Sequence, residues 1–111
     1  MMENPDAGTA LPVKDTQWVW VAVENPEGQA QLLGQMDEEN RIAFIPTFLE
    51  KDAAQSCFLK LTRKKGTKYE IQAIIYEDLV RYAGENGMLI FIMDDEGKLL
   101  ERVAPPAGPA D

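Results

Sequence analysis

Histidine is absent from this 111-residue sequence, and cysteine and serine each occur once, as Cys57 and Ser56. A serine or cysteine nucleophile usually depends on a neighbouring histidine that takes up the proton. Zinc sites are built largely from histidine or from clusters of cysteine. The composition therefore argues against a self-contained catalytic apparatus. We expect no enzyme activity, no cofactor, and no catalytic, cofactor-binding or metal-binding residue.

Long apolar runs are also missing. No stretch approaches the roughly 20 apolar residues that a membrane-spanning helix needs. The first residues, Met1-Met2-Glu3-Asn4, carry an acid where a secretory signal would carry Lys or Arg. A lone cysteine cannot form an intrachain disulfide, which fits a reducing compartment. These features predict a cytoplasmic protein without a membrane partner.

Positive charge is scarce and unevenly distributed. The formal net charge is −8, which argues against nucleic acid as the partner of the whole chain because phosphates would repel it. Much of the positive charge nevertheless falls in one segment, residues 60–68, which we call the basic loop. Its cations are Lys60, Arg63, Lys64, Lys65 and Lys68.

The two ends of the chain differ in composition from its middle. Residues 1–14 contain two prolines and a glycine without an apolar pattern, and residues 104–111 are rich in Pro, Ala and Gly. Such segments cannot bury enough apolar surface to fold. We predict a disordered arm over 1–14, a disordered tail over 104–111, and a single α+β domain over 15–103.

Within that domain, the first half is typical of strands. Residues 16–23 are rich in β-branched and aromatic side chains. Residues 29–36 alternate between polar and apolar or small side chains, and 41–45 are mostly apolar. Turn sequences at 25–28 and 37–40 separate them. We therefore predict an antiparallel meander of three strands.

The second half mixes helices and strands. Thr47 and Glu50 have the spacing of a capping box, and an apolar stripe with helical intervals follows until Gly66 can end the helix. Residues 69–75, 88–93 and 98–103 are predicted strands, and 77–85 a second helix. The order is βββ-α-β-α-ββ. It predicts one mixed sheet of five or six strands with two helices packed on it.

A short motif in this domain resembles a known family. Residues 45–54, Ile-Pro-Thr-Phe-Leu-Glu-Lys-Asp-Ala-Ala, resemble the Val-Pro-x-Phe-x-x-x-x-x-Ala signature of SseB-like domains, the enhanced serine sensitivity proteins. The resemblance covers about residues 17–103. It implies a bacterial, non-enzymatic α+β module of poorly defined role, and it transfers no catalytic residue. Independently of the family, Pro46 is expected to end a strand because it lacks a backbone donor.

Three further features each have a functional and a structural interpretation. The basic loop offers Arg63, Lys64, Lys65 and Lys68 to an acidic partner or a phosphate, or is a solvated helix end favoured by the macrodipole. The acidic runs 37–39 and 94–97 lack the spacing of a calcium loop and are favoured as turns. Cys57 lies on the apolar stripe and is favoured as a buried, inert residue.

Trp18 and Trp20 share one face of the first predicted strand. If helices cover that face they belong to the core, which we favour; if it is open they form an aromatic platform for a partner. We therefore predict a protein-interaction or regulatory module that binds another protein or itself. The alternative is a binder of small anions or nucleic acid that uses the basic loop.

Overall fold

The computed structural model describes residues 13–105. The predicted arm and tail lie outside this range except at Val13, Lys14, Ala104 and Pro105, which belong to no helix or strand. Seven strands and two helices make up the described part. They are β1 (Trp18–Glu24), β2 (Gln31–Leu32), β3 (Gln35–Asp37), β4 (Ile42–Thr47), α2 (Lys51–Phe58), β5 (Tyr69–Ile75), α3 (Tyr76–Asn86), β6 (Leu89–Met93) and β7 (Leu99–Val103). The α+β class and the two helices are confirmed.

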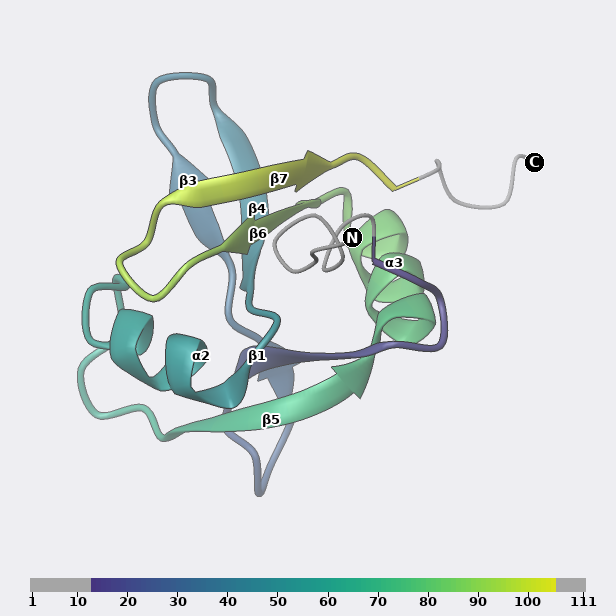
Figure 1. Ribbon diagram of the computed structural model, residues 1–111. Coiled ribbons are helices and arrows are strands. Elements are labelled where there is room, and N and C mark those ends of the chain that lie inside the picture. The colour runs from purple at the N-terminus through teal and green to yellow at the C-terminus, as the bar shows by residue number, and fades with distance from the viewer. Residues whose placement is uncertain (1–12, 106–111) are drawn as a thin grey trace.

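The prediction of one sheet is wrong. The strands form two sheets, sheet A with the order β2-β1-β5 and sheet B with the order β3-β4-β6-β7. Sheet A is antiparallel, whereas β4 and β6 in sheet B are parallel. In Figure 1 sheet A lies below sheet B, and α3 stands at one side where it closes the space between them. Backbone hydrogen bonds of 2.8 and 2.9 Å between Trp20 and Phe48 join the two sheets.

The division of the second predicted strand explains why there are two sheets. The alternating pattern over 29–36 does not form one strand but two, and β2 pairs with β1 while β3 pairs with β4. Gly34 lies at the break, where a Cβ would overlap the terminal methyl of Met88. A side chain at Gly34 would displace the flexible end of Met88, past which the chain runs closely from one sheet to the other.

Pro46 does not end its strand as predicted, because β4 continues to Thr47. The backbone amide of Phe48 donates to Trp20, on the side of β4 away from β6. Backbone groups in a strand alternate between its two sides, so the nitrogen of Pro46 faces the same side as that of Phe48. The missing donor of Pro46 thus removes no hydrogen bond to β6.

Helix α2 is shorter than predicted and begins later. Its first flanking residue is Glu50, and no side chain caps it. Thr47, the predicted cap, is a fully buried strand residue whose hydroxyl donates to the carbonyl of Ile45 at 3.1 Å. The capping-box prediction is therefore wrong, because the hydroxyl is used inside β4.

Helix α3 agrees with the prediction closely. It buries Leu79 and Ala83, and Val80 packs beside them. The helix ends at Gly87, which adopts the left-handed conformation with φ of 66°. A left-handed residue after the last turn is a common helix terminus, and glycine adopts it without steric cost.

Two apolar clusters hold the elements together. The larger lies between the sheets and α3 and contains Val19, Val21, Val23, Ile45, Tyr76, Leu79, Ala83, Ile90 and Ile92. The smaller lies under α2 and contains Phe48, Ala54 and Cys57, with Trp20, Ile71 and others at its border. Alternate residues of β1 supply the two clusters, so this one strand contacts both.

The first prediction concerns the larger cluster. Leu79→Ala is expected to lower the free energy of unfolding by about 2–5 kcal/mol, because Leu79 is 0% exposed and the lost side chain leaves a cavity. Leu59→Ala is the matched control, since Leu59 is 71% exposed and its removal should change stability by less than about 0.5 kcal/mol. Urea unfolding measures both. Equal effects of the two substitutions would contradict the described core.

Candidate interaction surfaces

The basic loop lies outside the helix to which the sequence assigned it. Helix α2 ends at Phe58, and Arg63, Lys64, Lys65 and Lys68 all lie between α2 and β5. They are too far beyond the last turn for the macrodipole to favour their charges. The interpretation as a helix end is therefore wrong, and the cations belong to a separate surface loop.

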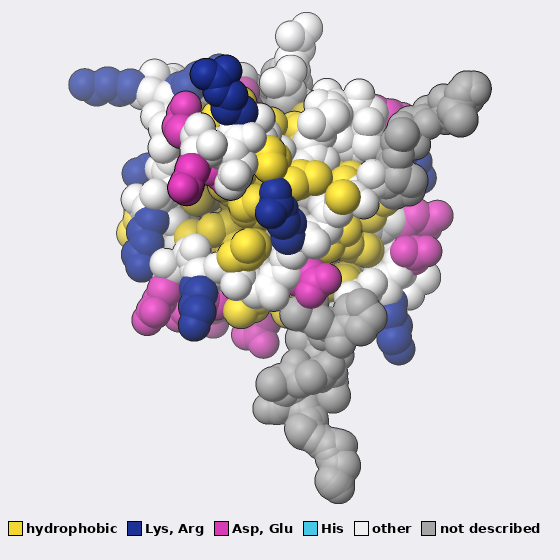
Figure 2. Space-filling view, turned by 90° about the horizontal axis from the view of Figure 1, so that it is seen from above, with side chains coloured by type: hydrophobic (Ala, Val, Ile, Leu, Met, Phe, Trp, Pro, Cys, Tyr) yellow, Lys and Arg dark blue, Asp and Glu magenta, His cyan; other side chains and the backbone are white. Residues whose placement is uncertain are grey.

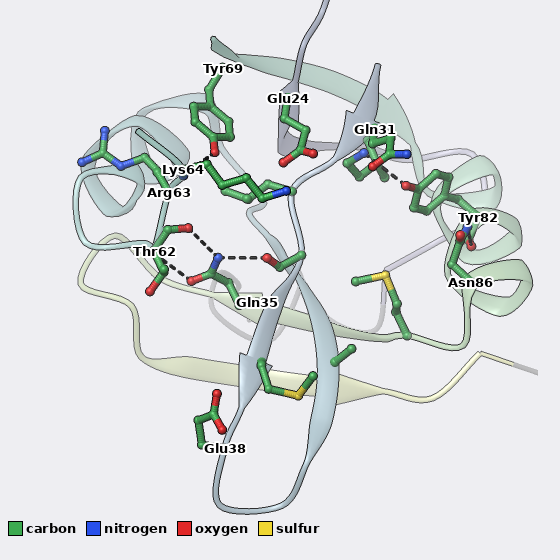
Figure 3. Close-up of a pocket in the computed structure, with 16 residues that line it drawn as sticks. Glu24, Gln31, Gln35, Glu38, Thr62, Arg63, Lys64, Tyr69, Tyr82 and Asn86 are labelled. Carbon is green, nitrogen blue, oxygen red and sulfur yellow. Dashed lines mark hydrogen bonds between the residues drawn. The ribbon is translucent and has the colours of Figure 1, made fainter. Parts of the chain in front are cut away.

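Side chains from two strands anchor this loop. The amide of Gln35 in β3 accepts a hydrogen bond from the Thr62 backbone N–H and donates one to the Thr62 carbonyl, both at 2.9 Å. The hydroxyl of Tyr69 in β5 accepts the Lys64 backbone N–H at 2.7 Å. Figure 3 shows Gln35 and Tyr69 reaching the loop from different sides. The backbone of the loop is therefore held at two points.

Aromatic contacts order one of the cations. The guanidinium carbon of Arg63 lies 4.8 Å from the centroid of the Phe58 ring, and that ring meets Tyr69 edge to face at 5.6 Å. Lys60 turns elsewhere, toward the carbonyl of Glu96 at 3.4 Å. Lys64, Lys65 and Lys68 are exposed. Lys60 and Arg63 thus make contacts with different parts of the protein.

A groove of about 670 Å³ runs between this loop, β2, β3 and the end of α3. Arg63 and Lys64 line it, but so do the carboxylates of Glu24 and Glu38. In Figure 3 Glu24 and Lys64 both point into the same part of the groove. An anion entering here would meet both signs of charge. The groove is consequently a poor cradle for phosphate.

The structure separates Trp18 from Trp20. Trp18 is 57% exposed, so the preference for a core position is wrong for this residue. Both tryptophans lie on the outer face of sheet A, opposite the face that enters the larger cluster. A helix of eight residues is about 12 Å long, whereas a strand of seven is about 23 Å, so α2 cannot cover the whole face. Trp18 lies at the uncovered end.

Trp20 is half-buried and belongs to the border of the smaller cluster. The ammonium of Lys51, in the first turn of α2, lies 5.6 Å from the centroid of the Trp20 ring. Directly opposite on β5, Ala73 faces Trp20 and Ile75 faces Trp18. We call this surface of Trp18, Trp20, Ala73 and Ile75 the Trp18 face. It is apolar at its centre and has a cation at its border.

Sequence reasoning missed a second apolar surface, on sheet B. Phe44 and Phe91 stack with ring centroids 4.1 Å apart, and Arg102 lies over Phe91. Leu99 and Leu100 in β7 are nearly half exposed. Figure 2 shows hydrophobic side chains gathered on the face seen from above, with a basic side chain among them and further charged side chains around them. The apolar run 88–93 signalled strand β6 but not which neighbours would cover each side.

Cys57 is buried, as predicted, and burial raises the pKa of its thiol above the ordinary value. A raised pKa lowers the fraction of reactive thiolate. The residue packs with Phe48 and Ala54 under α2. Its place in the structure is that of a small apolar side chain.

The acidic runs form turns. The Asp94 carboxylate accepts the backbone N–H groups of Lys98 at 2.8 Å and Glu96 at 2.9 Å. These hydrogen bonds hold the pKa of Asp94 below its ordinary value, the Lys98 amide most strongly. Asp37 likewise binds Asn40 and Glu39, and its pKa is lowered chiefly by the Asn40 side chain. Over residues 13–105 no group of three potential metal-ligating side chains is brought together.

Comparisons with known proteins do not assign this chain to a family. No family model matches the sequence, and neither a curated protein nor a solved structure is significantly similar to it. The resemblance to SseB-like domains therefore stays a prediction. No helix within the described residues is long and apolar enough to cross a membrane.

The second prediction concerns the anchored loop. Gln35→Ala removes both hydrogen bonds to Thr62, so the loop should open more often. We expect faster tryptic cleavage after Arg63, Lys64 and Lys65 without loss of the overall fold. Gln31→Ala is the control, because Gln31 lines the same groove but none of the hydrogen bonds within residues 13–105 involves its side chain. Unchanged cleavage in Gln35→Ala would show that this anchor does not order the loop.

The third prediction concerns the turn at Asp94. A carboxylate with a lowered folded-state pKa contributes stability above its unfolded pKa and loses it as the pH falls through the folded pKa. The stability difference between the wild type and Asp94→Ala should therefore be largest above about pH 5 and shrink on further acidification. Denaturant unfolding across pH measures it. Asp95→Ala, which removes a carboxylate without a hydrogen bond to the described residues, should keep the wild-type pH dependence.

Proposed function

We propose that this protein is a non-enzymatic protein-interaction or regulatory module of the cytoplasm that binds its partner through the Trp18 face. The exposure of Trp18 carries the proposal. A tryptophan that is 57% exposed, beside the half-buried Ile75 on an uncovered part of sheet A, keeps a large apolar area in water. The bacterial SseB-like module implied by residues 45–54 is consistent with this function and is part of the proposal.

The chemistry of the Trp18 face suits a protein partner. Tryptophan is enriched among the residues that dominate binding energy at interfaces, because it offers a large rigid area with a polar N–H. Lys51 over Trp20 adds a charge at the border of the face. Apolar centres with charged borders are the usual arrangement of such interfaces. The expected partner presents an apolar side chain to Trp18 and an acidic one to Lys51.

A second function is favoured by a different observation. Lys64, Lys65 and Lys68 are exposed on a loop whose backbone is anchored, so their charges are available to a small anion or to nucleic acid. Glu24 and Glu38 line the adjoining groove and oppose this use. The net charge of −8 opposes it as well. We therefore rank the Trp18 face first.

The fourth prediction tests both functions with three variants in a pull-down from lysate, at low and high salt. Trp18→Ala should lose the captured partner at least tenfold while it keeps the far-UV circular dichroism and thermal midpoint of the wild type. Leu59→Ala, the control at another exposed apolar residue, should keep the partner. The variant Lys64→Glu/Lys65→Glu should keep it as well.

The opposite pattern would identify the second function. Loss of the captured material in Lys64→Glu/Lys65→Glu and at high salt, with full retention in Trp18→Ala, overturns the proposal in favour of the basic loop. A Trp18→Ala protein that fails to fold would contradict the exposed position of Trp18 described above.

A further inference from the structure

The edge strands of the two sheets differ in how open they are. Strand β2 has two residues and β3 has three, so neither offers much backbone to a partner. Strand β7 carries Glu101 and Arg102, and its pairing with β6 is irregular at Ile92 and Met93. Short length, charge and bulges are the devices that protect sheet edges. Strand β5 is neither short nor bulged, and the only charged residue within it is Glu70.

Strand β5 is the long regular edge. Its seven residues pair with β1 in an unbroken register, and it contains no Pro, Gly or Lys. In Figure 1 it is the outermost strand of sheet A. A regular edge of this kind is a template for the addition of another strand.

The hydrogen bonds show which backbone groups face outward. Tyr76 donates to Gln17, and Asn25 donates to Lys68, so the even-numbered residues of this segment face β1. The odd-numbered residues of β5 turn their N–H and C=O groups to the open side. They are Tyr69, Ile71, Ala73 and Ile75. Within residues 13–105 the outward N–H and C=O groups of Tyr69, Ile71 and Ala73 have no hydrogen-bond partner on that side, whereas the carbonyl of Ile75, the residue before α3, accepts the first hydrogen bond of that helix.

The charges at the two ends of β5 favour antiparallel over parallel pairing with a second copy of the chain. The residues before the strand include the exposed Lys65 and Lys68, and the exposed Glu77 and Asp78 follow it in the first turn of α3. A second copy that is aligned parallel would place like charges together at both ends. An antiparallel copy would place Lys68 of each chain beside Glu77 of the other.

We propose that two copies of this chain associate through antiparallel pairing of β5 with β5, centred on Gln72, to form one continuous sheet of six strands. In this register Ile71 pairs with Ala73 of the second copy, and Tyr69 pairs with Ile75. These are the residues whose backbone groups face outward, so across a two-fold axis Ile71 and Ala73 exchange both hydrogen bonds, and the N–H of Ile75 donates to Tyr69. Lys68 of each copy then lies beside the start of the other copy's α3, whose first turn carries Glu77. The proposal uses the backbone edge of β5, whose Ala73 and Ile75 also belong to the Trp18 face, and does not use the side chains of Trp18 and Trp20.

The fifth prediction tests the charge pairing by sedimentation equilibrium of the full chain over a range of concentrations. The wild type should form a dimer, and Lys68→Glu and Glu77→Lys should each weaken it by roughly fivefold, since each substitution creates two like-charge contacts. A mixture of the two single variants should dimerise like the wild type, because every contact in the mixed pair again joins opposite charges. The double variant should also regain the wild-type affinity.

A backbone variant tests the edge itself. Ala73→Pro removes an outward N–H that is not used within sheet A, so it should abolish the dimer and retain the monomer fold. Ala73→Thr keeps the N–H and should dimerise. If Ala73→Pro does not fold, the dimer affinity of the mixture of Lys68→Glu and Glu77→Lys still tests the proposal. The proposal is overturned if the wild type stays monomeric at all concentrations. It is also overturned if the mixture of Lys68→Glu and Glu77→Lys dimerises no more tightly than either variant alone.

Discussion

The contact between Trp20 and Phe48 is the constraint on which the arrangement of this protein depends. Two backbone hydrogen bonds there connect β1 of sheet A to the end of β4 in sheet B. Phe48 is also fully buried beneath α2, so the same residue joins the sheets and fixes the helix that follows. Strand β1 is therefore hydrogen-bonded along one edge to β5 and, at Trp20, along the other edge to Phe48. Its two faces have different surroundings. One face enters the larger cluster, and the other is shared between α2 and solvent.

Much of the secondary structure could be predicted, because it follows from patterns of residue types over short segments of the sequence. The β-branched run of β1, the apolar run of β6 and the glycine after α3 identified these elements near their observed bounds. The sheet arrangement could not be predicted in this way. The alternation over residues 29–36 continues through Gly34, but its two halves pair with different strands, β2 with β1 and β3 with β4. Pairing between distant segments leaves little trace in the pattern of either one.

The candidate surfaces were predictable in kind but not in position. The basic loop and the tryptophans stand out in the sequence, but the environment of the loop depends on where α2 ends, and that of the tryptophans on where α2 begins. Helical periodicity extends to Leu61, whereas Gln35 and Tyr69 bind the backbone of Thr62 and Lys64 outside any helix. These tertiary hydrogen bonds prevail over the weak helical propensity of the segment. The exposure of Trp18 has a different origin: the first turn of α2 reaches Trp20 through Lys51, and the helix runs from there toward Tyr69, away from Trp18.

The parallel pairing of β4 with β6 also determines when the protein can fold during its synthesis. Strand β6 lies in the middle of sheet B, but it is the last strand but one along the chain. Until it leaves the ribosome, β4 lacks its inner neighbour, and the larger cluster around Ile45 lacks Ile90 and Ile92. Segments made at about 5–20 residues per second would remain incomplete for some seconds. During this interval the edge of β4 that later pairs with β6 stays unpaired.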